Sequence, residues 1–148
     1  MVDMPNAPSA DAPLILIVDD EKSITLTCSA ILEAHGYRTA TADDGLAALE
    51  LARKLHPDLV FSDVIMPRLN GVSLAIEVCD SLPETRILLF SGNTATADIL
   101  AGARAQGYEF PILAKPVPIP EMLQAVEAAL NAPLGSHRGQ RWSHRKAA

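Results

Sequence analysis

The chain has 148 residues, of which 49 % are hydrophobic and 20 % charged, and its formal net charge at pH 7 is −6. These values are ordinary for one globular domain with a single sizeable core. The longest purely apolar run has five residues, 14–18, whereas about 20 are needed to cross a bilayer. The acidic, proline-containing N-terminus does not resemble a secretory signal. We therefore expect a cytoplasmic protein without membrane insertion.

The charge is unevenly distributed along the chain. Residues 133–148 carry four basic residues and no acid, so the rest of the chain carries −10. An acidic body repels phosphate, which argues against nucleic-acid binding by the domain itself. We interpret residues 1–12 as a disordered N-terminus, 13–132 as one folded domain and 133–148 as a basic, disordered tail.

The first half of the chain alternates strand and helix patterns. Residues 14–18 are all apolar, which fits a strand buried on both faces. From Lys22 the apolar residues recur at i, i+4, i+7 and i+8, which predicts a helix that ends at Gly36. A short strand follows over 37–42, and the next helix ends before Pro57.

The second half repeats this alternation. A strand over 59–63 precedes a helix closed by Pro83, and the fourth and fifth strands are predicted over 86–92 and 110–116. Between the last two strands lies a helical stretch, 96–107, which is weakened by a glycine, and a final helix covers 119–131. This order predicts an α/β fold: a parallel sheet with right-handed crossovers and helices on both faces.

Reactive side chains gather at the carboxyl ends of the predicted strands. Asp19 and Asp20 follow the first strand, and Asp63 ends the third. Ser91 ends the fourth strand and Lys115 the fifth. Taken singly, Asp20 could cap a helix, and Ser91 could be a turn residue. Their shared position at one edge of the sheet, where open parallel sheets form their sites, favours a functional site instead.

The residue types in this cluster indicate phosphoryl chemistry. Carboxylates that lie close together repel one another unless a cation joins them, and oxygen ligands with room for water suit Mg²⁺. A lysine beside them would pair with the nucleophilic carboxylate at rest and later with an incoming anion. A carboxylate in such a site can accept a phosphoryl group, and Asp63, at the end of a buried strand, is the residue placed to react.

Four motifs occur in a specific order: VDDEKS, SDVIMPRLNG, LLFSGN and LAKP. Together they resemble the receiver domain of bacterial two-component response regulators, over residues 14–131. The resemblance implies a flavodoxin-like, doubly wound parallel sheet of five strands, in the order 2-1-3-4-5, with five helices. It also implies Asp63 as the phospho-acceptor and Asp19 and Asp20 as the acidic pair that holds Mg²⁺.

The resemblance assigns three further roles. The backbone carbonyl of Ile65 would be another metal ligand, and Ser91 would be the switch hydroxyl. Lys115 would be the lysine of the site, joined to Pro116 by a bond that is commonly cis in this family. The phosphoryl donor would be a histidine kinase or phosphotransfer protein, and the output would reach an unknown downstream protein. Beyond self-phosphorylation and autodephosphorylation, no enzyme activity is implied.

The chain departs from the family pattern in two respects. Receivers usually have Tyr or Phe three residues before the lysine, but here that residue is Ile112, and Phe110 lies two residues further back. We therefore expect the signal to pass through the loop and helix after Ser91. Secondly, the residues after 131 are too few for a DNA-binding domain, which predicts a stand-alone receiver.

Two other functions stay open at this point. One is an aspartate-nucleophile phosphohydrolase acting on a small substrate, although such enzymes commonly carry a second acid where this chain has Ile65. The other is a regulator that binds nucleic acid through its basic tail, which contains Trp142, although nothing resembles a recognition helix.

Overall fold

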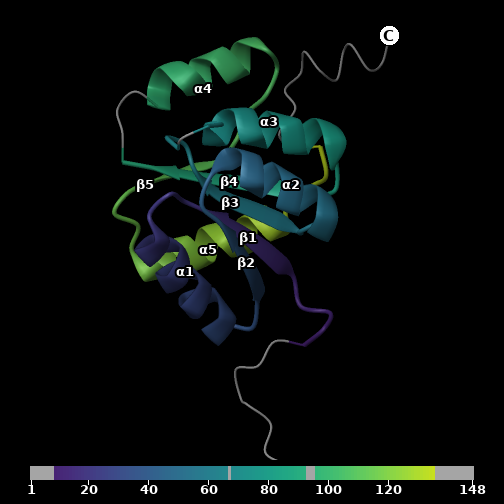
Figure 1. Cartoon of the computed structure of the whole chain (residues 1–148), viewed down its shortest axis with the longest axis vertical. Helices are drawn as coiled ribbons and strands as arrows, with labels where there is room; N and C mark the ends of the chain where they lie inside the picture. The colour runs from purple at the N-terminus through teal and green to yellow at the C-terminus, as the bar shows by residue number, and fades with distance from the viewer. Residues whose placement is uncertain (1–8, 67, 93–95, 136–148) are drawn as a thin grey trace, which may run out of the picture.

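The computed structural model describes residues 9–66, 68–92 and 96–135 (Figure 1). Most of the two stretches predicted to be disordered, 1–12 and 133–148, lies outside the described residues, and Trp142 lies outside them too. Strands and helices alternate as predicted. The strands are β1 (Leu14–Val18), β2 (Arg38–Ala42), β3 (Leu59–Asp63), β4 (Arg86–Ser91) and β5 (Ile112–Ala114). The helices are α1 (Lys22–Ala34), α2 (Gly45–Leu55), α3 (Gly71–Ser81), α4 (Thr96–Ala105) and α5 (Ile119–Leu130).

The five strands form one parallel sheet in the order β2-β1-β3-β4-β5, which confirms the predicted fold class. The chain starts at β1, moves outward to β2 and then returns across β1 to β3. The direction of winding therefore reverses between β1 and β3. The chain after β1 leads to α1 on one face of the sheet and the chain after β3 leads to α3 on the other, and such a switch point is where sites form in sheets of this kind.

Each face of the sheet has its own apolar core. Along β1, Leu16 and Val18 contribute to one core and Ile15 and Ile17 to the other, as the two-residue repeat of a strand requires. Helices α2, α3 and α4 cover the first face, and α1 and α5 cover the second (Figure 1). Among the described residues, no helix has the length and apolar character needed to cross a membrane.

The chain after β3 folds back tightly over the end of that strand. At the start of α3, Asn70 accepts a hydrogen bond from the backbone N–H of Ser73, and the N–H of Gly71 donates to the Val64 carbonyl. A Cβ atom on Gly71 would lie 2.0 Å from the Asp63 carbonyl oxygen. Only glycine permits this approach, and the approach fixes where the end of β3 lies.

The last strand is shorter than the predicted stretch 110–116. Proline has no backbone N–H, so Pro111 and Pro116 limit the hydrogen-bonded ladder on the two sides of β5. The peptide bond between Lys115 and Pro116 is cis, as the resemblance implied. The Lys115 N–H still donates to the carbonyl of Ser91, which ties the residue after β5 to the end of β4.

Candidate functional site

Three carboxylates meet at the carboxyl end of the sheet. Oxygen atoms of Asp19, Asp20 and Asp63 all lie within 4.8 Å of one another. Asp19, directly after β1, is fully buried, and Asp63, the last residue of β3, is 7 % exposed. Asp20 is exposed. The cluster therefore has a buried floor and one acidic group that faces solvent.

Lys115 connects two of these carboxylates. Its Nζ atom donates to Asp63 Oδ2 at 3.1 Å and to Asp19 Oδ2 at 3.2 Å. The same ammonium group lies over the ring of Phe90, 4.8 Å from its centroid, where the negative face of the ring attracts a cation. The structure thus brings Asp19, Asp63 and Lys115 into direct contact from three different strand ends.

The pKa values in this cluster follow from burial and from the hydrogen bonds to Lys115. Burial by itself would lower the pKa of Lys115, but its hydrogen bonds to Asp63 and Asp19 outweigh this effect and raise the pKa. Burial also raises the pKa of Asp19, against the opposing effects of the Glu21 N–H and Lys115. The cluster holds three acids, and Lys115 pairs with two of them, so the site favours an additional cation.

Asp19 also organises the start of α1. Its Oδ1 atom accepts a hydrogen bond from the N–H of Glu21 at 2.9 Å, and Glu21 is the N-cap residue of that helix. Asp20 is therefore not the N-cap of α1, and the alternative prediction that it caps this helix is wrong. A carboxylate oxygen of the exposed Asp20 lies within 4.8 Å of oxygens of Asp19 and Asp63, which is close enough for the three residues to bind one cation together.

Ser91, the last residue of β4, is buried beside the cluster but is hydrogen-bonded in another direction. Its Oγ atom lies 2.5 Å from Oγ1 of Thr96, the first residue of α4, and either hydroxyl can be the donor. Thr96 was not among the residues predicted for the site. Its position at the N-terminus of the predicted helix is the signal that could have indicated a contact with the strand end.

The two isoleucines that depart from common patterns both lie partly at the surface. Ile65, two residues after Asp63, is 38 % exposed, and Ile112 on β5 is 39 % exposed. The nearby aromatic residue Phe110 is instead buried in the core under α3 and α4. The proposed role of the Ile65 carbonyl as a metal ligand remains a prediction.

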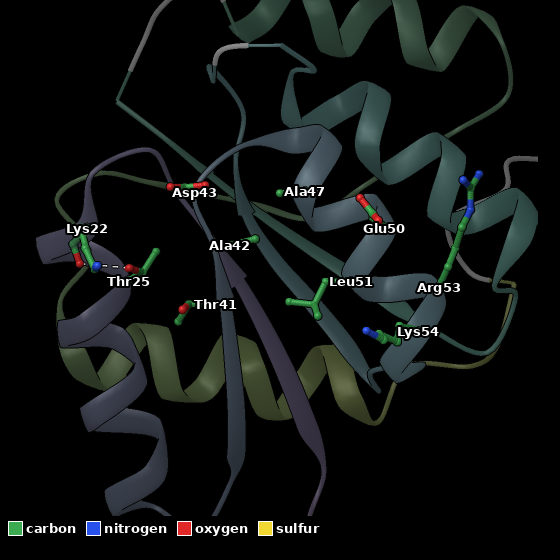
Figure 2. Close-up of a pocket in the computed structure, with 10 residues that line it drawn as sticks. All are labelled: Lys22, Thr25, Thr41, Ala42, Asp43, Ala47, Glu50, Leu51, Arg53 and Lys54. Carbon is green, nitrogen blue, oxygen red and sulfur yellow. Dashed lines mark hydrogen bonds between the residues drawn. The ribbon is translucent and has the colours of Figure 1, made fainter.

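Several cavities lie outside the carboxylate cluster among the described residues, and two of them border α1. One, of about 770 Å³, lies between α1, β2 and α2, where charged side chains of both signs, such as Lys22 and Glu50, line it (Figure 2). None of the five predicted site side chains, all of them described residues, belongs to its lining. The other, of about 470 Å³, is mostly apolar and lies between α1 and α5, where Lys115 and Phe90 form part of its wall.

A comparison with known families identifies the class of protein. Residues 15–127 match the family model of the response regulator receiver domain. The chain therefore belongs to this family, whose members are signalling domains of two-component systems rather than enzymes of the usual kind.

Curated relatives include two mycobacterial regulators. The chain is 32 % identical over 116 residues to the probable transcriptional regulatory protein TcrX of Mycobacterium tuberculosis. It is 33 % identical over 119 residues to the DNA-binding response regulator MtrA of Mycolicibacterium paratuberculosis. Each match covers 78 % of this chain but only 49 % and 50 % of the respective relative, so the chain spans about half the length of these proteins.

Solved receiver structures share the fold over nearly their whole length. The chemotaxis response regulator CheY4 of Vibrio cholerae has a TM-score of 0.69 and 29 % identity, with coverage of 80 % of this chain and 98 % of that one. The receiver domain of NtrX from Brucella abortus has a TM-score of 0.70 and 30 % identity, with coverage of 80 % and 99 %. The residues of the carboxylate cluster all lie within the stretch 15–127 that matches the family model.

Proposed function

We propose that Asp63 is the phosphoryl acceptor of this receiver domain and that a histidine kinase or phosphotransfer protein is the donor. One observation carries the proposal. The Asp63 carboxylate is nearly buried at a strand end, accepts a hydrogen bond from Lys115 at 3.1 Å, and lies within 4.8 Å of two other carboxylates. An aspartate that served only as the partner of Lys115 in a buried ion pair would not require two further carboxylates beside it.

The proposed transfer is a displacement at phosphorus. A carboxylate oxygen of Asp63 attacks the phosphorus atom of a phosphorylated imidazole, and the new O–P bond forms as the P–N bond breaks. The electron pair of the broken bond stays on the imidazole nitrogen, which takes up a proton as it leaves. The Lys115 ammonium, already in contact with Asp63, offsets the negative charge that accumulates on the phosphoryl oxygens.

We further propose that Asp19, Asp20 and Asp63, with the backbone carbonyl of Ile65, hold Mg²⁺. The donor set fits this ion, because hard oxygen ligands and an exposed side leave room for bound water. When bound, the ion supplies positive charge to the phosphoryl oxygens. In this proposal Ser91 donates its hydroxyl proton to one of these oxygens after transfer.

We propose that phosphorylation is read out through changed protein–protein contacts of the domain. The downstream protein is recognised by the surface near the site, and the domain itself performs only self-phosphorylation and autodephosphorylation. The name of MtrA states that this relative binds DNA. MtrA is about twice as long as the region that matches this chain.

The acceptor assignment is tested by intact-mass measurement after incubation with acetyl phosphate and Mg²⁺. We expect one phosphoryl adduct on the wild-type protein and none on Asp63→Asn. Asp98→Asn, which removes a carboxylate from α4 away from the cluster, is the control and should be labelled normally. Chelation of Mg²⁺ should slow labelling strongly. Full labelling of Asp63→Asn would show that the acceptor is another residue.

A further inference from the structure

The hydroxyl pair of Ser91 and Thr96 joins the site to α4. Both residues are buried, at 8 % and 5 % exposure, and the two oxygen atoms are 2.5 Å apart. Ser91 has a single hydroxyl proton and a single oxygen atom that must serve any partner. When the Ser91 side chain rotates toward a phosphoryl group on Asp63, its Oγ atom moves, and the distance to Thr96 Oγ1 changes with it.

Helix α4 has fewer buried residues than the other two helices of its layer. Its buried residues are Thr96 and Ala103, whereas α2 has four buried residues and α3 has six. Gly102 further weakens the helix, since glycine is a poor helix former. Of the two buried residues, Thr96 is the one in contact with the site.

Aromatic side chains near β5 are held in place by their own contacts. The Phe110 ring stacks on Tyr108 with centroids 6.2 Å apart, and the Tyr108 hydroxyl donates to Asp80 of α3 at 2.7 Å. Both rings belong to the buried core. Ile112 stands at the position where an aromatic residue is usual. It is partly exposed, and its β-branched side chain is short and stiff at χ1, so it cannot make the large movement of an aromatic ring.

We propose that Thr96 is a positioning residue for the Ser91 hydroxyl and the link from the site to α4. In the unphosphorylated protein, Thr96 holds the Ser91 hydroxyl and Ser91 in turn holds the first turn of α4. When Ser91 turns to the phosphoryl group, Thr96 is left as a buried hydroxyl without its partner. Because this is unfavourable, the first turn of α4 shifts or opens to water. The shift of α4 rests on the proposed phosphorylation of Asp63, whereas the positioning of Ser91 by Thr96 in the free protein does not.

Hydrogen exchange of the α4 amides measures this link directly. The protein is examined free and with beryllofluoride and Mg²⁺, a stable substitute for the phosphoryl group. In the wild type we expect beryllofluoride to speed α4 exchange about two- to tenfold, the range that loss of one hydrogen bond gives. Thr96→Val, which keeps the shape but not the hydroxyl, should already show the fast exchange in the free protein. Thr96→Ser, which keeps the hydroxyl, should restore wild-type behaviour.

A double-mutant comparison separates the link from a general effect of Thr96 on the helix. Ser91→Ala should speed α4 exchange in the free protein as Thr96→Val does, and the combined variant should show no further increase. Ile112→Ala serves as the control and should leave the α4 response to beryllofluoride intact. Melting temperatures of all variants confirm that each of them folds.

Three outcomes would overturn the inference. The first is normal α4 exchange in free Thr96→Val, and the second is an equal effect of Thr96→Val with and without Ser91. The third is a wild-type protein that is phosphorylated by mass but whose α4 exchange does not respond to beryllofluoride. Failure of the proposed function would look different, because no adduct would form on Asp63. The free-protein comparison would then still decide whether Thr96 positions Ser91.

Discussion

At the scale of single residues, the site crowds three carboxylates around one ammonium group. Lys115 contacts Asp19 and Asp63, whereas Asp20 is exposed to water and takes part in none of the ion pairs among the described residues. The negative charge of Asp20 therefore adds repulsion without a compensating ion pair. This repulsion is offset only when a cation binds, so Asp20 has opposite effects on the stability of the metal-free protein and on metal affinity.

The first prediction concerns Asp20→Asn. In buffer with a chelator, the melting temperature should rise by about 1–3 °C because one repulsive charge is removed. Affinity for Mg²⁺, measured by titration calorimetry, should fall. The control is Glu84→Gln, which removes a charge at the opposite end of the sheet, just before β4, and should change neither property appreciably. A clear loss of stability in Asp20→Asn would contradict the argument from charge crowding.

The second prediction concerns the lifetime of the phosphorylated protein. Ile65 follows Asp63 by two residues and lies partly at the surface, but it offers no side-chain hydrogen bond to an attacking water molecule. Ile65→Asn should therefore speed the loss of the phosphoryl adduct, followed by intact mass over time, by about two- to tenfold. Ile112→Asn, the same change at an isoleucine of similar exposure, should leave the rate unaltered. An unchanged rate in Ile65→Asn would place the positioning of water elsewhere.

At the scale of elements, two glycines in helices on the same face of the sheet have opposite surroundings. The start of α3 is packed directly on the end of β3, with no space for a side chain at Gly71. In α4, by contrast, a Cβ atom on Gly102 would meet nothing within 4 Å. The end of β3 is therefore held by close packing against α3, whereas α4 has room for a side chain at Gly102.

These two glycines allow a matched prediction with one chemical change. Gly71→Ala places a Cβ atom 2.0 Å from the Asp63 carbonyl oxygen and should lower the free energy of unfolding by about 1–3 kcal/mol or more. Gly102→Ala, in open space within a helix, should raise it by about 0.5–1 kcal/mol. Urea denaturation measures both values. Equal effects of the two changes would contradict the packing described for the end of β3.

Element boundaries show where local signals stop being sufficient. Periodicity predicted β1 and β3 at their observed limits, because an acidic residue stands directly after the apolar run of β1 and directly before that of β3. It extended β5 too far, because the apolar composition of residues 110–116 does not take into account that Pro111 and Pro116 cannot donate to the hydrogen-bonded ladder. The cap of α1 was also open from sequence, since Asp20 and Glu21 both precede the helix and only the hydrogen bonds distinguish them.

At the scale of the whole molecule, the sequence by itself determined the alternation of strands and helices and the presence of carboxylates, a hydroxyl and a lysine at strand ends. Both follow from local chemistry, namely the spacing of apolar residues and the residues that end each run. The strand order did not follow from periodicity, and it was expected only from the resemblance of four motifs to receiver domains. Pairing between strands depends on contacts between distant segments, which a local pattern does not contain.

Only the tertiary structure decided which of these groups touch. It placed Lys115 against both Asp19 and Asp63, although these residues are 96 and 52 positions away from it in the chain. It turned the Ser91 hydroxyl toward Thr96 and buried Phe110 in the core. The physical reason is common to all three. Side-chain directions and hydrogen-bond partners are set by how helices pack on the sheet, and that packing is a property of the folded chain as a whole.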